Sequence, residues 1–132
     1  MTHLARVSTK LHARPSREDI LRVIEDAWSE VTSSDPARWS PQNPAWGQCA
    51  VTALVIQDYL GGTILRGQMV DGSHYWNTLP DGEELDATIQ QFPARPPFSI
   101  IVQRPREVIL ENPDTWRRYS TLAGRVRRNL GL

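Results

Sequence analysis

The chain has 132 residues, with 15 basic and 15 acidic side chains, a net charge of zero and a single cysteine. This length predicts one domain spanning residues 1–132, and one thiol excludes an intramolecular disulfide, a cysteine-based zinc site and an iron–sulfur cluster. The balanced charge argues against nucleic acid and acidic membranes as partners, and no apolar run is long enough to cross a bilayer.

The N-terminal third predicts an arm, a helix and a long loop. Residues 1–14 show no periodic pattern and lack the apolar stretch of a signal peptide, so we expect an arm on a cytoplasmic protein. Ser16 and Asp19 form a capping-box-like start, and apolar residues at helical spacing predict a helix over 17–32. A loop rich in proline follows over 33–46, and its length favours a functional role.

The middle of the chain predicts a buried helix followed by a β-meander. Residues 47–60 leave almost no polar face, which indicates a helix buried on most sides. Asp71-Gly72 and Pro80-Asp81-Gly82 predict two tight turns. The three antiparallel strands that these turns separate are 63–70, 73–79 and 83–88.

The C-terminal third predicts a fourth strand over 98–103 and a last helix. Asn112 and Pro113 suit the N-cap and first position of that helix. The expected fold is α+β, with a central buried helix on a small antiparallel sheet and a helix from each end of the chain beside it. Five residues of the last helix are expected on its buried side: Trp116, Tyr119, Ala123, Val126 and Leu130.

Cys49 lies just inside the start of the most buried helix. The free N–H groups and partial positive charge of a helix N-terminus favour a thiolate over a thiol, so this position suits a nucleophile. The alternative is an ordinary buried cysteine that packs and does not react.

A nucleophilic cysteine needs a base, and His74 is the one histidine outside the arm. If residues 80–82 form a three-residue loop, Leu79 pairs with Glu83, and His74 and Asp86 lie on one face about 7 Å apart diagonally. A two-residue loop would place Asp86 on the opposite face, but the Pro-Asp-Gly chemistry favours the first register. The alternatives are a hairpin histidine and a solvated strand acid without a functional role.

Three motifs carry a resemblance to a known family. Trp46-Gly47-Gln48-Cys49 resembles the aromatic-Gly-Gln-Cys nucleophile motif of transglutaminases, and His74-Tyr75-Trp76-Asn77 resembles their His-x-Trp-Asn strand. Leu85-Asp86-Ala87-Thr88 is similar to the strand that carries their third catalytic residue. The whole region 46–92 resembles the small YunG-like bacterial proteins.

The resemblance implies a papain/transglutaminase-like core over residues 46–92. Cys49 would be the nucleophile, His74 the general base and acid, and Asp86 the acid that orients His74. Ala50 departs from the tryptophan that follows the cysteine in transglutaminases, and the chain has no room for their further domains and calcium sites. We therefore expect acyl transfer from an amide or thioester, with no metal or cofactor.

The expected substrate is a peptide, a protein or a small molecule with an amide or thioester bond. Hydrolysis and deamidation are the first expectation, and transfer to an amine is the second. A protein of a different class, a non-catalytic binding module on a decayed papain-like fold, is the alternative.

An oxyanion needs two hydrogen-bond donors, and the backbone N–H of Cys49 is one candidate. The side chains that could supply the second donor are Gln42, Gln48 and Trp46, although the two glutamines could equally be loop polar residues. Trp76 and Asn77 could shield or orient His74, or serve only in packing.

The last helix is rich in arginine. Arginines are favourable near the C-terminal end of a helix, so we expect them to form a solvated face. The alternative is that they form a binding site for an acidic partner. The arginines in question are Arg117, Arg118, Arg125, Arg127 and Arg128.

Overall fold

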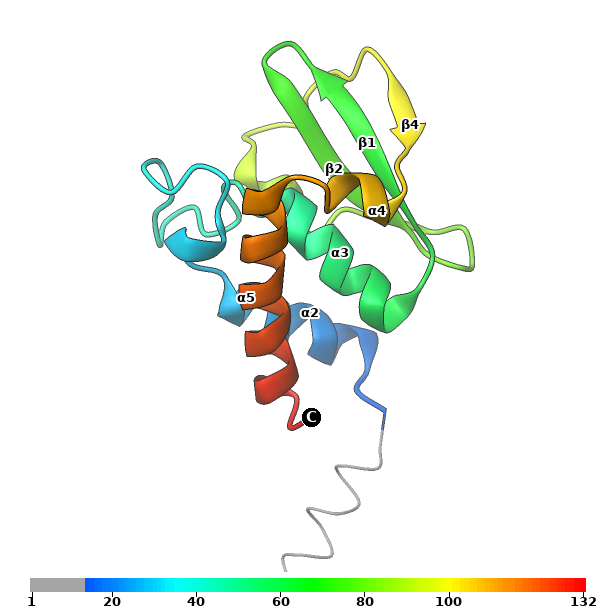
Figure 1. The fold of residues 1–132 in the computed structure, drawn as a ribbon. Helices are drawn as coiled ribbons and strands as arrows, with labels where there is room; N and C mark the ends of the chain where they lie inside the picture. Colours follow the sequence, from blue (N-terminus) through cyan, green and yellow to red (C-terminus); the bar gives the residue numbers. More distant parts are fainter. Residues whose placement is uncertain (1–13) are drawn as a thin grey trace, which may run out of the picture.

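The computed structural model describes residues 14–132, so the predicted arm lies outside the described residues except for Arg14. The fold is α+β, as expected (Figure 1). None of the helices described is long and apolar enough to cross a membrane. The elements are α2 (Arg17–Ala27), η1 (Glu30–Thr32), α3 (Cys49–Leu60), β1 (Thr63–Met69), β2 (Gly72–Thr78), β3 (Glu84–Leu85), η2 (Ile89–Gln91), β4 (Ile101–Gln103), α4 (Arg106–Ile109) and α5 (Pro113–Asn129).

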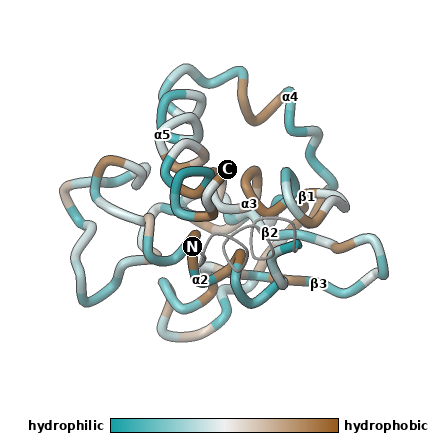
Figure 2. The backbone as a smooth tube through the Cα atoms, turned by 90° about the horizontal axis from the view of Figure 1, so that it is seen from below, coloured by the Kyte–Doolittle hydropathy of each residue, from teal (hydrophilic) through white to brown (hydrophobic). Residues whose placement is uncertain are grey.

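Helix α3 occupies the centre of the molecule, between α2, α5 and the strands (Figure 2). Its residues from Val51 to Ile56 are all buried, which confirms the expectation of a helix covered on most sides. Val51, Val55 and Ile56 among them pack with buried apolar side chains of α2 and α5. This apolar core anchors the start of α3, where Cys49 is the first helical residue.

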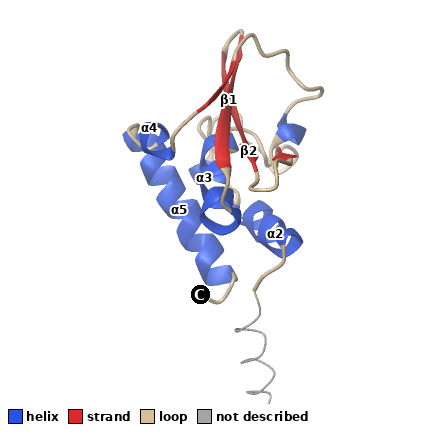
Figure 3. Cartoon of the chain, turned by 90° about the vertical axis from the view of Figure 1, so that its right-hand side faces the viewer, coloured by secondary structure: helices blue, strands red, loops and turns tan. Residues whose placement is uncertain are grey.

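The four strands form one antiparallel sheet in the order β3-β2-β1-β4. The long β1–β2 hairpin projects beyond the helices (Figure 3). The predicted three-residue loop between β2 and β3 is confirmed: Leu79 N donates to Glu83 O at 2.8 Å, and Gly82 N donates to Leu79 O at 2.9 Å. Gly82 has φ +90°, the left-handed conformation expected at the end of this loop.

The first helix is shorter than predicted. The capping box of Ser16 and Asp19 is present, but the helix ends at Ala27 and not at residue 32. Trp28 becomes extended, and its indole N–H donates to Thr52 Oγ1 at 2.9 Å in the core. This contact with α3 draws the chain out of the helix, and Ser29 caps a short 3₁₀ turn, η1.

The second helix begins at Cys49 and not at residue 47, because Gly47 has φ +73°. The β1–β2 turn is Val70-Asp71 and not Asp71-Gly72, since Met69 pairs with Gly72. Gln68 stabilises this tip, because its side-chain amide donates to the carbonyls of Met69 and Gly72 at 3.0 and 3.1 Å. The shift preserves the alternation of faces, so every side chain keeps its predicted side.

Two strands are shorter than predicted. The third strand, predicted over 83–88, contains only Glu84 and Leu85, because the chain turns immediately after Asp86. The fourth, predicted over 98–103, is regular only from Ile101. Just before it, Ser99 N and Ile100 O both bond to Gln68, so the ladder is irregular there.

The buried side of α5 differs from the prediction. Trp116 is 53% exposed, whereas Thr115 and Arg118 are buried together with Leu122 and Val126. Arg118 turns inward because it finds partners there: its guanidinium donates to Asp114 Oδ2 at 2.8 Å and to Thr32 O at 3.3 Å. The expectation of a wholly solvated arginine face is therefore wrong for Arg118.

Candidate active site

Cys49 is held at the start of α3 by a tight turn. Gly47 requires its positive φ there, and a Cβ on it would collide with Ser33 and Ser34. Ser34 N donates to Gly47 O at 2.9 Å, and Gly47 N donates to the side-chain oxygen of Gln91 at 3.3 Å. These bonds fix the backbone immediately before the half-buried thiol.

The first turn of α3 keeps backbone donors available. Gln48 is the N-cap, but its side chain makes no capping hydrogen bond. The first N–H groups of a helix have no partner inside the helix, so they can bind an anion or a developing oxyanion. The backbone N–H of Cys49, predicted as one oxyanion donor, lies at this terminus.

His74 and Asp86 are in direct contact, as the register predicted. The imidazole Nε2 lies 2.9 and 2.8 Å from the two carboxylate oxygens of Asp86. In the β2–β3 register Asn77 pairs with Leu85, so the next residue, Asp86, falls beside the face that carries His74. Nε2 donates its proton in this hydrogen bond to the carboxylate, which leaves Nδ1 for another group.

Aromatic rings enclose the imidazole of His74, which is fully buried. Trp76 and Phe98 stack with it at centroid distances of 5.7 and 6.1 Å, and Phe92 meets it edge-on at 5.1 Å. Rings packed on several sides restrict the rotation of the imidazole, so its two nitrogens keep their separate directions. Trp76, predicted to shield or orient His74 or to serve only in packing, contacts the ring, and its own indole donates to Glu84 at 2.8 Å.

The electrostatics connect His74 with Cys49. Burial lowers the pKa of His74, but the hydrogen bond to Asp86 and the neighbouring Cys49 outweigh it and raise the pKa to about 9. Nδ1 is buried and makes no well-aligned hydrogen bond with any residue from 14 to 132. The influence of Cys49 on this pKa indicates that the two side chains are neighbours without a tight hydrogen bond, an arrangement common in sites without a bound substrate.

Of the three side chains predicted as a second oxyanion donor, two donate to other partners and the third does not line the cavities at Cys49. Gln48 is buried and donates its amide to Ser29 O at 2.9 Å, away from the thiol. Trp46 is beside the thiol, but its indole N–H donates to Asp35 at 3.2 Å. Gln42 is exposed and does not line the cavities at Cys49.

Asn77 has a packing role. It is buried, and its amide donates to Ala53 O in α3 at 3.0 Å, so it joins the strand of His74 to the helix of Cys49. It holds the two elements together but does not contact the imidazole through a hydrogen bond among the described residues.

Gln91 is a supporting residue that the sequence patterns missed. It is buried, donates to the carbonyl and hydroxyl oxygens of Thr88 at 3.1 Å, and accepts from Gly47 N. It thus connects the segment after Asp86 to the turn before Cys49. The signal in the sequence was weak, because a glutamine in a loop shows neither periodicity nor a motif of its own.

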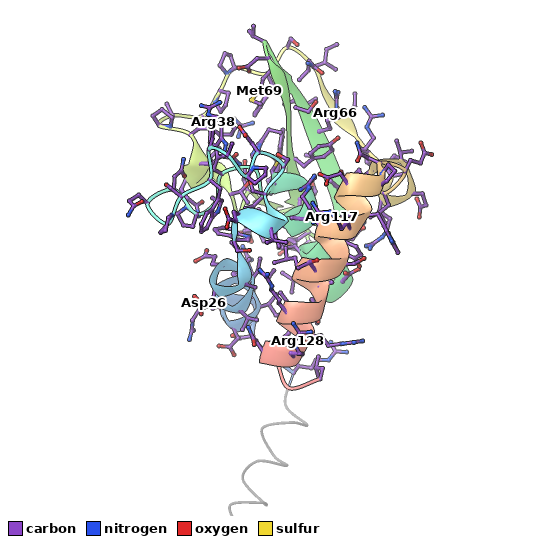
Figure 4. The ribbon with its side chains drawn as sticks, turned by 60° about the vertical axis from the view of Figure 1, so that its left-hand side comes forward. Asp26, Arg38, Arg66, Met69, Arg117 and Arg128 are labelled. Carbon is purple, nitrogen blue, oxygen red and sulfur yellow. The ribbon has the colours of Figure 1, made fainter. Side chains whose placement is uncertain are left out.

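Two cavities meet at Cys49. The larger, of about 710 Å³, lies between the 33–46 loop, the β1–β2 tip and the segment after η2. Arg38 and Met69, from two of its walls, lie at the same end of the molecule (Figure 4). The smaller, of about 280 Å³, reaches towards α4 and α5. The thiol is therefore accessible from two sides.

No group of three histidine, cysteine, aspartate or glutamate side chains that could hold a metal ion occurs within residues 14–132. The polar groups of the site are instead one thiol, one imidazole, one carboxylate and the free N–H groups of a helix. This set can transfer protons and form a covalent bond to a carbonyl carbon.

Comparison with known proteins identifies relatives of this chain. A family model described as "YunG protein" matches residues 16–131. A protein of Bacillus subtilis (strain 168) named "Uncharacterized protein YunG" is 35% identical over 94 residues, which cover 71% of this chain and 78% of that protein. No solved structure matches the chain.

Proposed function

This chain belongs to the YunG family, and we propose that it is a thiol-dependent acyl-transfer enzyme with Cys49, His74 and Asp86 as its catalytic triad. One observation carries the proposal. A single imidazole, fully buried, is bonded through Nε2 to Asp86, and the only cysteine of the chain lies near enough to contribute to its raised pKa. That order of nucleophile, base and orienting acid is the general arrangement of an activated nucleophile.

The ionic state of the pair supports the proposal. With its pKa raised to about 9, His74 carries a proton and a positive charge at neutral pH. A cation beside a cysteine at a helix N-terminus favours the thiolate, which is the nucleophilic form. Asp86 stabilises the imidazolium and fixes the orientation of its ring.

The reaction follows from these positions. The Cys49 thiolate attacks the carbonyl carbon of an amide or thioester, and the negative charge that forms on the carbonyl oxygen is bound by N–H groups of the first turn of α3. The bond to the leaving amine or thiol then breaks, and the leaving group takes the Nδ1 proton of His74. The acyl group remains on Cys49 as a thioester.

The second half of the reaction regenerates the enzyme. Neutral His74 accepts a proton from water or an amine as that group attacks the thioester carbon. The bond to sulfur breaks, and the acid or the new amide leaves. Cys49 is then again a thiolate and His74 again an imidazolium. Hydrolysis and deamidation use water, whereas amine transfer uses an amine in the same step.

We also propose that the core has the papain/transglutaminase-like arrangement. The supporting features are a central helix that begins with the cysteine and an antiparallel sheet whose second strand carries the histidine. The larger cavity, at about 710 Å³, is within the range of roughly 300–1,000 Å³ typical of ligand sites, so a peptide segment or a small molecule can reach the thiol.

Alkylation of Cys49 by iodoacetamide tests the proposal, because the chain has no other thiol. An ordinary thiol is only about 1% ionised at pH 6.5, so we expect alkylation of the native protein at that pH to be at least about tenfold faster than that of the unfolded chain. His74→Gln and Asp86→Asn should remove most of this advantage. Asp26→Asn, an exposed carboxylate on α2, is the matched control and should leave it unchanged.

A pH profile of alkylation that is the same in the native and unfolded chains, and is unaffected by His74→Gln, would contradict catalysis and favour a non-catalytic binding module. Mass analysis of the protein after exposure to a cell extract supplies a second measurement. An acyl adduct on Cys49 that is absent from Cys49→Ser would identify the acyl group directly.

A further inference from the structure

The smaller cavity beside Cys49 has a distinctive lining. Two arginines, Arg104 and Arg118, contribute to it together with Ser34 and Ser73, and no acidic residue lines it. We propose that this cavity binds a carboxylate group of the substrate, close to the bond that Cys49 attacks. This inference rests on the proposed function and specifies its substrate class.

Arg104 is the main reason. It follows β4, and its backbone N–H donates to Ile64 O at 2.8 Å, so its main chain is fixed. Its guanidinium forms no ion pair and no hydrogen bond within the part of the chain that the structure describes, and its Nε atom is buried. A partly desolvated guanidinium without an acceptor is unfavourable, and a bound anion would supply the missing acceptor.

Arg118 completes the positive lining. It is only 4% exposed, and it is held by Asp114 Oδ2 at 2.8 Å, Thr115 Oγ1 at 3.2 Å and Thr32 O at 3.3 Å. Asp114 offsets much of its charge, so Arg118 forms a fixed wall of the cavity, while Arg104 supplies the charge that is not balanced.

The available donors favour a carboxylate over a phosphate. Helix α5 begins at the cavity, but Asn112 Oδ1 already accepts from the N–H groups of Asp114 and Thr115 at 2.9 and 3.1 Å. The helix terminus therefore offers few free donors for the several oxygens of a phosphate. One guanidinium fork matches the two oxygens of a carboxylate.

The two cavities differ in charge and size, so we expect each to hold a different part of the substrate. The larger cavity has a mixed lining that includes Asp35, Arg38 and Asp71. The smaller one, at about 280 Å³, has room for a group and not for a whole ligand. The substrate class that fits is an amide or thioester whose carbonyl is within a few bonds of a carboxylate, such as the C-terminal peptide bond of a peptide.

The test compares two alkylating reagents of similar shape and different charge, iodoacetate and iodoacetamide, at constant ionic strength. The positive cavity should make the ratio of the iodoacetate rate to the iodoacetamide rate at Cys49 higher in the native protein than in the unfolded chain. Arg104→Met should lower the ratio of the iodoacetate rate to the iodoacetamide rate by about five- to tenfold, because it removes a unit charge from the cavity that both Arg104 and Cys49 line. Arg104→Lys should retain most of the ratio.

Arg128→Met is the matched control, because it removes the same charge from an exposed position near the end of α5 (Figure 4). Its ratio should equal that of the native protein. The iodoacetamide rate within each variant reports whether the thiol and the fold are intact. An unchanged ratio in Arg104→Met, with a normal iodoacetamide rate, would overturn the inference.

Protection experiments distinguish a carboxylate from a phosphate as the anion that the smaller cavity binds. N-acetylglycine should slow alkylation of the native protein by iodoacetamide and should have no effect on Arg104→Met. Protection by inorganic phosphate that equals or exceeds that of N-acetylglycine would overturn the assignment to a carboxylate. Failure of the proposed function would instead show as an iodoacetamide rate typical of an unfolded chain, whatever the ratio of the two reagents.

Discussion

Two buried regions of this molecule are held together in opposite ways. Around the middle of α3, apolar side chains from α2, α3 and α5 fill the space, and Val51, Val55 and Leu122 are fully buried. Around His74, a fully buried imidazole is held by a carboxylate and by aromatic rings. The apolar region gains stability through burial, whereas the polar region holds an imidazole in one orientation with one nitrogen unbonded.

The difference lies in how strongly each region depends on the direction of its contacts. An apolar contact can be replaced by another of similar volume at a small cost, because packing does not depend on direction. The polar cluster depends on direction, since the hydrogen bond forms only when Nε2 of His74 points at the carboxylate of Asp86. Substitutions in the two regions should therefore have separable effects.

The largest expected effect on stability is in the apolar region. Leu122→Ala removes a fully buried side chain from α5 and should lower the free energy of unfolding by about 2–5 kcal/mol. Measured in urea, the midpoint should fall, while the alkylation of Cys49 at pH 6.5 stays close to native under folding conditions. Val31→Ala, at a position 45% exposed, should change stability little. Loss of thiol reactivity in a folded Leu122→Ala would contradict the separation of the two regions.

The next effect concerns the pH dependence of stability. The folded-state pKa of His74, about 9, is higher than its ordinary value of 6.5, so the folded state binds a proton more tightly than the unfolded state. This contribution is fully present below pH 6.5 and is lost as the pH rises to about 9. It corresponds to a decrease on the order of 3 kcal/mol, at about 1.4 kcal/mol per pKa unit.

Urea unfolding at several pH values between 6 and 9.5 measures this dependence. His74→Gln should flatten the curve over that range, because it removes the titrating group. A Cys49 thiolate in the folded state would offset this loss up to about pH 8.5, so the imidazole chemical shift of His74 supplies a separate measurement of its charge. A neutral His74 in the native protein at pH 7.5 would contradict the charge state assigned to it.

Asn77 joins the two regions, and its removal should have a smaller effect. Asn77→Ala leaves the carbonyl of Ala53 without its partner and should cost about 1–3 kcal/mol of stability. It should also slow the alkylation of Cys49, because the strand of His74 loses a bond to α3. Asn129→Ala, at the exposed end of α5, is the control. Equal reactivity in Asn77→Ala would show that this bond serves stability alone.

The smallest effect is at the N-terminus of α2. Ser16→Ala removes the hydrogen bond from Asp19 N to the Ser16 hydroxyl, at 3.0 Å, and should cost about 1 kcal/mol without a change in alkylation. Ser120→Ala, an exposed serine within α5, should not destabilise the protein. Thermal unfolding of the three proteins is sufficient for this comparison.

The features that could be predicted from the sequence are those with a local physical cause. The capping box of α2 and the Pro-Asp-Gly turn depend on neighbouring residues, and the turn in turn fixes the register that brings Asp86 to His74. The position of Cys49 at the start of an apolar helix could likewise be predicted from a pattern. The contact between His74 and Asp86 could therefore be predicted in two local steps, first the type of turn and then the register of the strands.

The features that could not be predicted depend on distant partners. Arg118 turns inward to reach Thr32 O, 86 residues away, and hydropathy alone placed Trp116 on that side. The amide of Gln48 is occupied by Ser29 O, from a segment that the expected helix over 17–32 would have placed differently. Tertiary hydrogen bonds of this kind leave no periodic signal in a sequence.

The enclosure of His74 has a spectroscopic consequence. Its Nε2 proton lies between the carboxylate of Asp86, whose side chain is 15% exposed, and aromatic rings, so solvent reaches it only when the surrounding segment opens. Protons protected in this way exchange slowly with water. The imidazole N–H should therefore give a persistent downfield resonance in proton NMR spectra, and its line width would report how often the segment around Phe92 opens.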